Sequence, residues 1–239
     1  MFFEWNEQTL RWLLDASEYT GYSRGLAQLL LRHISGGSLC DVGCGMGLVD
    51  FELAGHVKDI TCVDISSFAV DFIRGEVQRR GIGNLTALVQ DGLTLRGQWD
   101  TVMALFHGDV KEICRPYLRC ARERLILVTH AEAEGSFGPQ GHRVIKACNA
   151  QKTIQWLDAQ HIRYTLERHE LEFGQPHRSF EDALAFTRTY SRPAPDELLA
   201  EHVKQAIVET GREDFPFYTP KKRRFGIFII GRDDNEEFS

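Results

Sequence analysis

Apolar and polar residues alternate along this chain in blocks that predict strands and helices in turn. Short apolar runs with the length of buried strands occur at residues 39–42, 60–63, 99–107, 125–129 and 225–230. Between these runs, apolar residues recur at the spacing of one helix face, as from Ser66 to Gly81. This alternation predicts an α/β fold with a doubly wound, mostly parallel sheet, whose ligands bind beyond the carboxyl ends of the strands.

The chain before the first strand is predicted to be helical. Asn6 can cap a helix whose leucines share one face, and residues 18–23 interrupt this pattern. A second helix continues to Ile34 and ends at the glycines of residues 36–37. We therefore expect two helices over residues 1–35, at a lid-like position before the first strand.

The chain after the predicted strand at residues 125–129 is less regular. Residues 135–141 form a glycine-rich connection that could gate a pocket, and helical spacing follows over residues 144–157. Residues 162–173 and 223–232 predict two long strands.

An aromatic-rich insertion, residues 175–222, separates these two long strands. Ser179, with Asp182 three positions later, predicts the start of one helix. Pro195 near the start and Gly211 near the end bracket a second helix.

Composition indicates one well-buried domain and excludes several kinds of partner. The chain has 239 residues, of which 43% are hydrophobic, so we expect a single domain over residues 1–239. No apolar stretch approaches the roughly 20 residues of a membrane span, and Glu4 and Glu7 stand where a signal peptide would be basic. We therefore expect a cytoplasmic protein with no membrane partner.

The net charge of −6 argues against a nucleic-acid partner, and the basic run 221–224 is expected to be a solvated strand edge.

The cysteines predict neither a metal site nor a disulfide framework. Six are present, but no C-x-x-C pair occurs. Cys40, Cys44 and Cys62 lie in or beside predicted core strands, where small buried thiols are common.

The clearest chemical signal is the glycine-rich turn after the first strand, within residues 39–51. Gly43, Gly45 and Gly47 lack side chains, so the turn can adopt positive φ and a ligand can approach the main chain. The helix start behind the turn offers unpaired N–H groups. Asp64, at the carboxyl end of the next predicted strand, is placed to accept hydrogen bonds from two ribose hydroxyls. These features together predict a ligand that contains adenosine.

The spacing of the glycines separates two classes of cofactor. A dinucleotide fingerprint, G-x-G-x-x-G, would place its third glycine at position 48, where this chain has Leu48. The order here is D-x-G-x-G-x-G, with Asp41 inside the strand and Gly47 one position early. This order resembles motif I of the class I S-adenosylmethionine-dependent methyltransferases.

Further segments resemble the same family in the expected order over residues 35–130. Residues 88–92 look like the end of the third strand, whose carboxylate meets the adenine amino group in the family, and Asp91 is the matching residue. Residues 99–107 resemble the fourth strand and 125–129 the fifth. The resemblance implies S-adenosylmethionine as the cofactor. It implies cofactor contacts from Asp41, Gly43, Cys44, Gly45, Gly47, Asp64, Ile65, Asp91, Gly92, Leu105 and Phe106.

The resemblance also implies how the chain is divided. A cofactor-binding core over residues 36–174 would contain most of a seven-stranded Rossmann-like methyltransferase sheet, in which the two long strands form an antiparallel edge hairpin. Residues 1–35 would fold over the cofactor, so Tyr19 or Tyr22 could reach its methionyl carboxylate, although packing between helix and sheet is the commoner role. The insertion 175–222 would form part of a substrate cap.

The implied reaction is transfer of a methyl group from a sulfonium to a nucleophile. Positioning supplies most of the rate, and a general base is needed only if the acceptor must lose a proton early. His107, just beyond the fourth strand, is the predicted catalytic base and His130 the second candidate, although both histidines could instead be structural. Residues 105–108 replace the N-P-P-Y tetrapeptide of enzymes that methylate nucleic-acid amino groups. We therefore expect a small-molecule acceptor.

Two other classes of function remain open. A nicotinamide-dependent oxidoreductase would share the sheet and Asp64, but it conflicts with the glycine spacing. A non-catalytic partner or sensor domain could bind S-adenosylmethionine without turnover. The sequence specifies neither the acceptor atom nor the oligomeric state.

Overall fold

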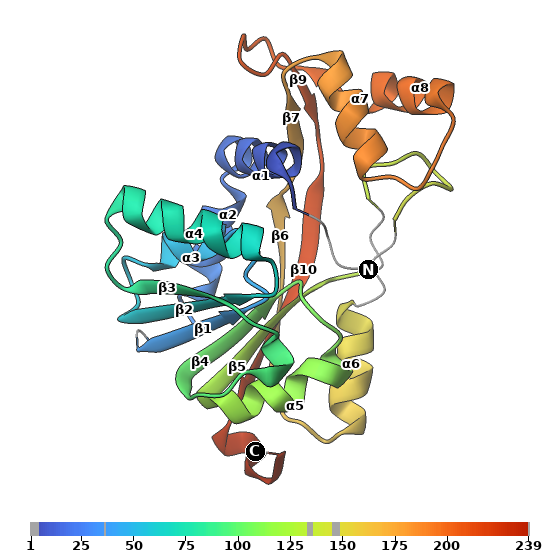
Figure 1. The fold of residues 1–239 in the computed structure, drawn as a ribbon. Coiled ribbons are helices and arrows are strands. Elements are labelled where there is room, and N and C mark those ends of the chain that lie inside the picture. The colour runs from blue at the N-terminus through green and yellow to red at the C-terminus, as the bar shows by residue number, and fades with distance from the viewer. Residues whose placement is uncertain (1–4, 36, 133–135, 145–148, 239) are drawn as a thin grey trace.

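The computed structural model describes residues 5–35, 37–132, 136–144 and 149–238, and within them seven strands form one central sheet (Figure 1). The strand order is β3-β2-β1-β4-β5-β10-β6. Strands β1 to β5 are parallel, and β10 is antiparallel to both β5 and β6. The bounds are β1 Ser38–Val42, β2 Asp59–Asp64, β3 Leu85–Val89, β4 Trp99–Leu105, β5 Ala121–His130, β6 Thr165–Glu172 and β10 Lys222–Gly231. The predicted mostly parallel sheet with an antiparallel edge hairpin is confirmed.

Helices cover both faces of the sheet, because successive strand residues point to opposite sides. Leu39 and Met103 belong to the hydrophobic core formed with α2, α3 and α4, whereas Cys40 and Val102 belong to the core formed with α5 and α6. The helix bounds are α2 Tyr22–Leu30, α3 Leu48–Leu53, α4 Ser67–Arg80, α5 Val110–Cys120 and α6 Ala150–Ala159. The order of the strands reverses between β1 and β4, so their carboxyl ends border the crevice where such sheets bind ligands.

Helix α1, Glu7–Thr20, begins after Asn6 as predicted. The Asn6 side chain accepts a hydrogen bond from the Thr9 N–H at 2.9 Å, and the Thr9 hydroxyl accepts one from the Asn6 N–H at 3.0 Å. The predicted interruption at residues 18–23 is too long. Only Gly21, with φ of 66°, separates α1 from α2, because a glycine adopts this left-handed conformation without strain.

Two other predicted helix boundaries are wrong. Helix α2 ends at Leu30 rather than near Ile34, because the chain turns there and the His33 N–H bonds to the Leu30 carbonyl at 2.8 Å. Asn149 caps α6, so this helix begins after Val144. Residue 135 of the predicted glycine-rich connection and residues 145–148 of the predicted helix lie outside the described residues.

The insertion contains a second, three-stranded antiparallel sheet that the sequence pattern did not predict. Its strands, in the order β7-β9-β8, are β7 Gln175–His177, β9 Phe217–Thr219 and β8 Val208–Glu209. Strands of two or three residues are too short for an alternating pattern to identify. Ser179 caps α7, Phe180–Thr189, as predicted, by accepting from the Asp182 N–H at 3.1 Å. Helix α8, Asp196–Ala206, ends before Gly211 because the chain enters β8.

Strands β6 and β10 rise together beyond the parallel strands, toward the insertion (Figure 1). The Phe173 N–H donates to the Lys221 carbonyl at 2.7 Å, so the two ends of the insertion meet. Helix α1 contacts the insertion through Asp182, whose carboxylate accepts from the Trp12 indole at 2.9 Å and from Arg11 at 2.5 Å. Among the described helices, none has the length and apolar character needed to cross a membrane.

Candidate active site

The glycine turn after β1 is bonded to the end of β2. The Gly43 N–H donates to the Val63 carbonyl at 2.7 Å, and the Gly45 N–H donates to the Asp64 carboxylate at 2.8 Å. The other oxygen of Asp64 accepts from the Ser66 N–H at 2.9 Å. These bonds hold the Asp64 carboxylate against the turn, as the predicted site requires.

Each glycine of the turn has a positive φ, and two of them lack space for a side chain. The φ values of Gly43, Gly45 and Gly47 are 76°, 55° and 65°. A Cβ on Gly43 would lie 2.2 Å from the His107 ring, and one on Gly47 would lie 3.0 Å from Ile73. Neighbouring side chains therefore occupy the space that larger residues would need at positions 43 and 47.

The N-terminal segment approaches the same turn. A Cβ placed on Gly45 would lie 3.5 Å from the indole ring of Trp5. Trp5 is half-buried and precedes α1 directly. Trp5 therefore lies close to the glycine turn, and no sequence pattern singled it out.

Asp91 follows β3 and lies at the strand end adjacent to that of Asp64. Its carboxylate accepts from the Leu93 N–H at 2.9 Å and caps the short 3-10 helix η1, Gly92–Thr94. A Cβ on Gly92 would lie 2.3 Å from Val42 and 2.5 Å from the Tyr117 hydroxyl.

Two large apolar side chains are exposed beside these carboxylates. Ile65 is 54% exposed and Leu93 is 46% exposed. Because Ile65 directly follows Asp64 and Leu93 lies two residues after Asp91, a planar ligand at this edge of the sheet would cover both.

A pair of buried carboxyl groups lies beneath the turn. Asp41 in β1 is 1% exposed, and Asp50 in α3 is fully buried. Burial, and then the charge of Asp50, raise the pKa of Asp41 well above its usual range. Burial also raises the pKa of Asp50 to about 6. Asp41, a predicted cofactor contact, is therefore buried, and its raised pKa favours the neutral carboxyl form.

Cys44, in the turn itself, has an unreactive thiol. A hydrogen bond with Cys62 lowers its pKa, but burial and the nearby carboxylates outweigh this effect and raise the pKa to about 11. The thiol is therefore protonated at neutral pH, in agreement with the expectation that position 44 needs only a small side chain.

The segment after β4 places two aromatic rings on opposite sides of the strand end. Phe106, which follows Leu105, has an unusual φ of 55°, and its N–H donates to the Val128 carbonyl at 2.8 Å. The Phe106 ring lies 4.9 Å from the ring of His130 and 5.9 Å from that of Phe225, measured between centroids. His130, the second candidate base, is thus packed against Phe106 and is 7% exposed.

His107 turns the other way, against Gly43 and α5. Its Nε2 lies 3.4 Å from the Tyr117 hydroxyl. Burial lowers the pKa of His107, although Asp64 and Asp91 act in the opposite direction. The imidazole is therefore neutral near pH 7 and able to accept a proton.

The two candidate tyrosines lie in different places. Tyr19 stacks on Tyr218 of the insertion, with centroids 4.9 Å apart. Tyr22 lies 4.8 Å from the Phe173 ring, and its hydroxyl accepts from Arg223 at 3.4 Å. The Tyr22 hydroxyl therefore contacts an arginine of β10.

The basic run 221–224 was predicted to be a solvated strand edge, and Arg223 departs from this prediction. Lys222 and Arg224 are exposed, whereas Arg223 points inward from β10 onto aromatic rings. The alternation of residues along a strand is the signal that could have identified it, because every second residue of β10 faces the core.

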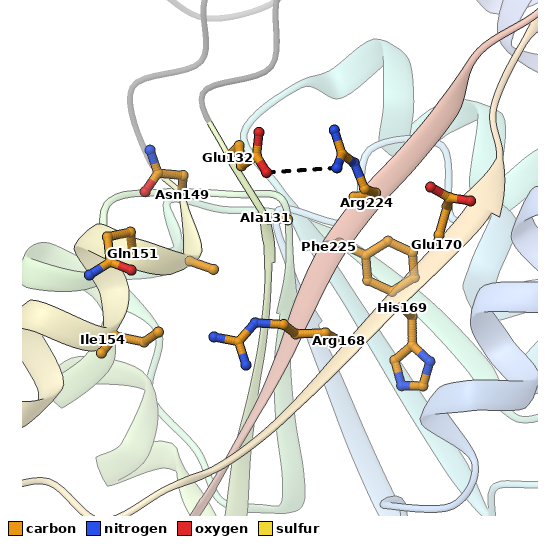
Figure 2. Close-up of a pocket in the computed structure, with 11 residues that line it drawn as sticks. Ala131, Glu132, Asn149, Gln151, Ile154, Arg168, His169, Glu170, Arg224 and Phe225 are labelled. Carbon is orange, nitrogen blue, oxygen red and sulfur yellow. Dashed lines mark ion pairs between the residues drawn. The ribbon is translucent and has the colours of Figure 1, made fainter.

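A cavity of about 670 Å³ opens beside the carboxyl end of β5, on the side of α6 (Figure 2). Arg168 reaches from β6 across it toward α6, and Arg224 pairs with Glu132 at 3.7 Å. None of the predicted cofactor residues lines this cavity, but Phe225 belongs both to it and to the ring cluster at Phe106. The cavity is lined by Ala131, Glu132, Asn149, Ala150, Gln151, Ile154, Arg168, His169, Glu170, Arg224 and Phe225.

Residues 39–125 match the family described as a methyltransferase domain. The matched segment begins in β1 and ends in β5, so it contains the glycine turn, Asp64, Asp91 and His107.

Solved structures share the fold over most of their length. Magnesium protoporphyrin IX methyltransferase from Synechocystis PCC 6803 with bound SAM has a TM-score of 0.52 and 16% identity, over 95% of this chain and 86% of that one. A putative RNA methyltransferase from Pyrococcus horikoshii has a TM-score of 0.54 and 13% identity, over 88% and 84%. The 4+2 cyclase SpnF has a TM-score of 0.56 and 18% identity, over 87% and 80%. At these identities the likeness establishes the fold and leaves the reaction to be argued from the site.

Proposed function

We propose that this chain, which carries a methyltransferase domain over residues 39–125, transfers the methyl group of S-adenosylmethionine to a small acceptor molecule. The observation that carries the proposal is the Asp64 carboxylate, held by the Gly45 N–H beside a turn of three glycines with positive φ. When bound, the cofactor supplies an electrophilic methyl group on a sulfonium. The chain itself has to bind, orient and shield the reactants.

The adenosine part fits the edge formed by β2 and β3. Each Asp64 oxygen already accepts one backbone N–H and has a further lone pair for a ribose hydroxyl. Asp91, at the adjacent strand end, would accept from the adenine amino group. Ile65 and Leu93 would cover the faces of the base, which accounts for their exposure. Gly92 would allow the base close to the main chain.

The rest of the cofactor fits the turn and the end of β4. Gly43, Gly45 and Gly47 would let its methionyl part lie against backbone, and Leu105 and Phe106 would border it where the strand order reverses. Trp5 would cover this part and exclude water, because it already lies over Gly45.

His107 is the group best placed to accept a proton, since burial keeps its imidazole neutral. A small acceptor is favoured because the chain has a net charge of −6, whereas proteins that bind nucleic acids need a basic surface. The insertion, residues 175–222, would form part of the acceptor cap, since β6 and β10 carry it beyond the ends of the parallel strands (Figure 1).

Calorimetric titration with S-adenosylmethionine and S-adenosylhomocysteine tests the proposal. We expect micromolar binding that falls at least tenfold in Asp64→Ala and in Gly45→Val, because these changes remove the ribose acceptor and fill the turn. Asp59→Asn, at the exposed start of β2, and Gly55→Ala, where a Cβ meets nothing within 4 Å, are the matched controls.

Three outcomes would contradict the proposal. One is a folded wild type that binds neither compound, and another is preferential binding of NADH, which would restore the oxidoreductase hypothesis. The third is binding of both compounds with no transfer of labelled methyl groups to a metabolite extract, which would indicate a non-catalytic sensor. A parallel assay with RNA tests the acceptor class separately, because methyl transfer to RNA would replace the small acceptor by a nucleic acid.

A further inference from the structure

Arg223 lies in a cage of aromatic rings at the start of β10. Its guanidinium carbon is 3.2 Å from the centroid of the Phe173 ring, 4.8 Å from that of Phe106 and 5.2 Å from that of Tyr22. Stacking of this kind orients a guanidinium and covers its faces, which leaves the N–H groups at its edge free to bind.

The edge of this guanidinium has unused donors. Within the described part of the chain, its side chain has one hydrogen bond, to the Tyr22 hydroxyl at 3.4 Å, and no ion pair. An arginine side chain has five N–H donors in a fixed fork. The neighbouring basic residues differ, because Lys222 pairs with Glu170 at 2.9 Å and Arg224 with Glu132 at 3.7 Å.

The position of Arg223 separates it from the cofactor turn. In the sheet order, β4 and β5 lie between β1 and β10, so the two strands are about 14 Å apart at about 4.8 Å for each strand pair. Phe106, at the end of β4, touches the cage and lies between Arg223 and the turn. Arg223 therefore lies on the far side of Phe106 from the glycine turn.

We propose that the methyl acceptor is a small monoanionic carboxylate and that Arg223 binds its carboxylate group. This inference rests on the proposed function. A carboxylate is planar and accepts two parallel N–H bonds from one guanidinium, so it fits a fork whose faces are stacked between rings. Among the described residues, the cage contains one guanidinium and no second unpaired cation. A single positive charge matches a monoanion better than a phosphate dianion. The rings would pack against the apolar part of the acceptor.

The proposal is tested by calorimetric titration of S-adenosylhomocysteine-saturated protein with benzoate, and with benzamide as the uncharged control. We expect benzoate to bind the wild type at least tenfold more tightly than Arg223→Gln, whereas benzamide binds both equally. Arg223→Lys keeps the charge but loses the fork, so it should give an intermediate affinity. Lys222→Gln, one residue away on the exposed face of β10, should bind benzoate like the wild type.

Each other outcome has a definite meaning. Equal affinity of benzoate for the wild type and Arg223→Gln, or no binding to the wild type, would overturn the proposal and leave Arg223 as a structural contact. Loss of S-adenosylhomocysteine binding in Arg223→Gln would overturn it by assigning the guanidinium to the carboxylate of the cofactor. Tighter binding of inorganic phosphate than of benzoate would overturn the carboxylate assignment. The proposed function fails separately, if the wild type does not bind S-adenosylhomocysteine at all.

Discussion

The buried carboxyl pair beneath the glycine turn makes stability depend on pH in a defined direction. Burial raises the pKa of Asp50 to about 6 in the folded protein, whereas an unfolded aspartate titrates near about 3.9. A carboxyl group with a raised folded pKa stabilises the fold most when both states are protonated, below a pH of about 3.9. This contribution is lost as the pH rises through about 6, because the folded state resists ionisation.

The size of the effect follows from the gap between the two pKa values. A gap of about 2 pH units corresponds to about 3 kcal/mol in the free energy of unfolding. Asp50→Asn keeps the shape of the side chain and removes its charge. We therefore expect this variant to exceed the wild type at pH 8 by up to about 3 kcal/mol, and the difference to disappear near pH 4.

Urea unfolding followed by circular dichroism at a series of pH values measures this difference. Asp59→Asn, at the exposed start of β2, is the control and should follow the wild type at every pH. The difference between wild type and Asp50→Asn belongs to the pair with Asp41, since the two groups titrate together. Parallel curves for the two proteins from pH 4 to 8 would refute the reasoning, because they would show that Asp50 ionises as easily folded as unfolded.

Three further predictions concern other parts of the molecule. Gly92→Ala should lower the free energy of unfolding in urea by about 1–3 kcal/mol, because its Cβ would overlap side chains of β1 and α5; an unchanged midpoint would contradict the close packing. Trp5→Ala should weaken S-adenosylhomocysteine binding about tenfold in calorimetry with little change in stability, as expected for a cover over the turn. Burial lowers the pKa of His177 to about 4, so its contribution to stability is present above about pH 6.5 and lost as the pH falls toward 4. Between pH 6.5 and 4 the wild type should therefore lose about 3 kcal/mol of unfolding free energy that His177→Gln does not lose. A variant as acid-sensitive as the wild type would disprove this.

The parts of the fold that depend on local rules could be predicted from the sequence. The strand pattern identified β1, β2 and β4, and the glycine spacing placed Gly43, Gly45 and Asp64 around one turn. Parallel topology brings the carboxyl ends of neighbouring strands to one edge of the sheet, so the position of Asp91 beside the strand end of Asp64 could be predicted. Capping side chains likewise predicted the starts of α1 and α7.

The remaining features depend on contacts between segments that are far apart in the chain. Trp5 covers Gly45 only because α1 is anchored on Asp182 of the insertion. Alternation along β10 could have predicted that Arg223 faces inward, but its contacts with Phe173 and Tyr22 depend on the packing of β10 with β6 and α2. The small sheet of the insertion has strands too short for their period to be recognised. Helix α2 ends in a local turn and α8 ends where the chain enters β8, with no glycine or proline directly after either helix.

The meeting of Phe173 and Lys221 across the β6–β10 ribbon has a consequence for how this protein can change over evolution. Because the segment between them leaves and re-enters the ribbon at one hydrogen-bonded point, its replacement by a shorter or longer segment would leave the register of the central sheet intact. Such a replacement would also remove the anchor that Asp182 gives to α1, so the position of Trp5 beside the glycine turn would change with the segment. A lineage built on this scaffold can therefore exchange this segment as one module while Arg223 and the strands of the central sheet stay in place.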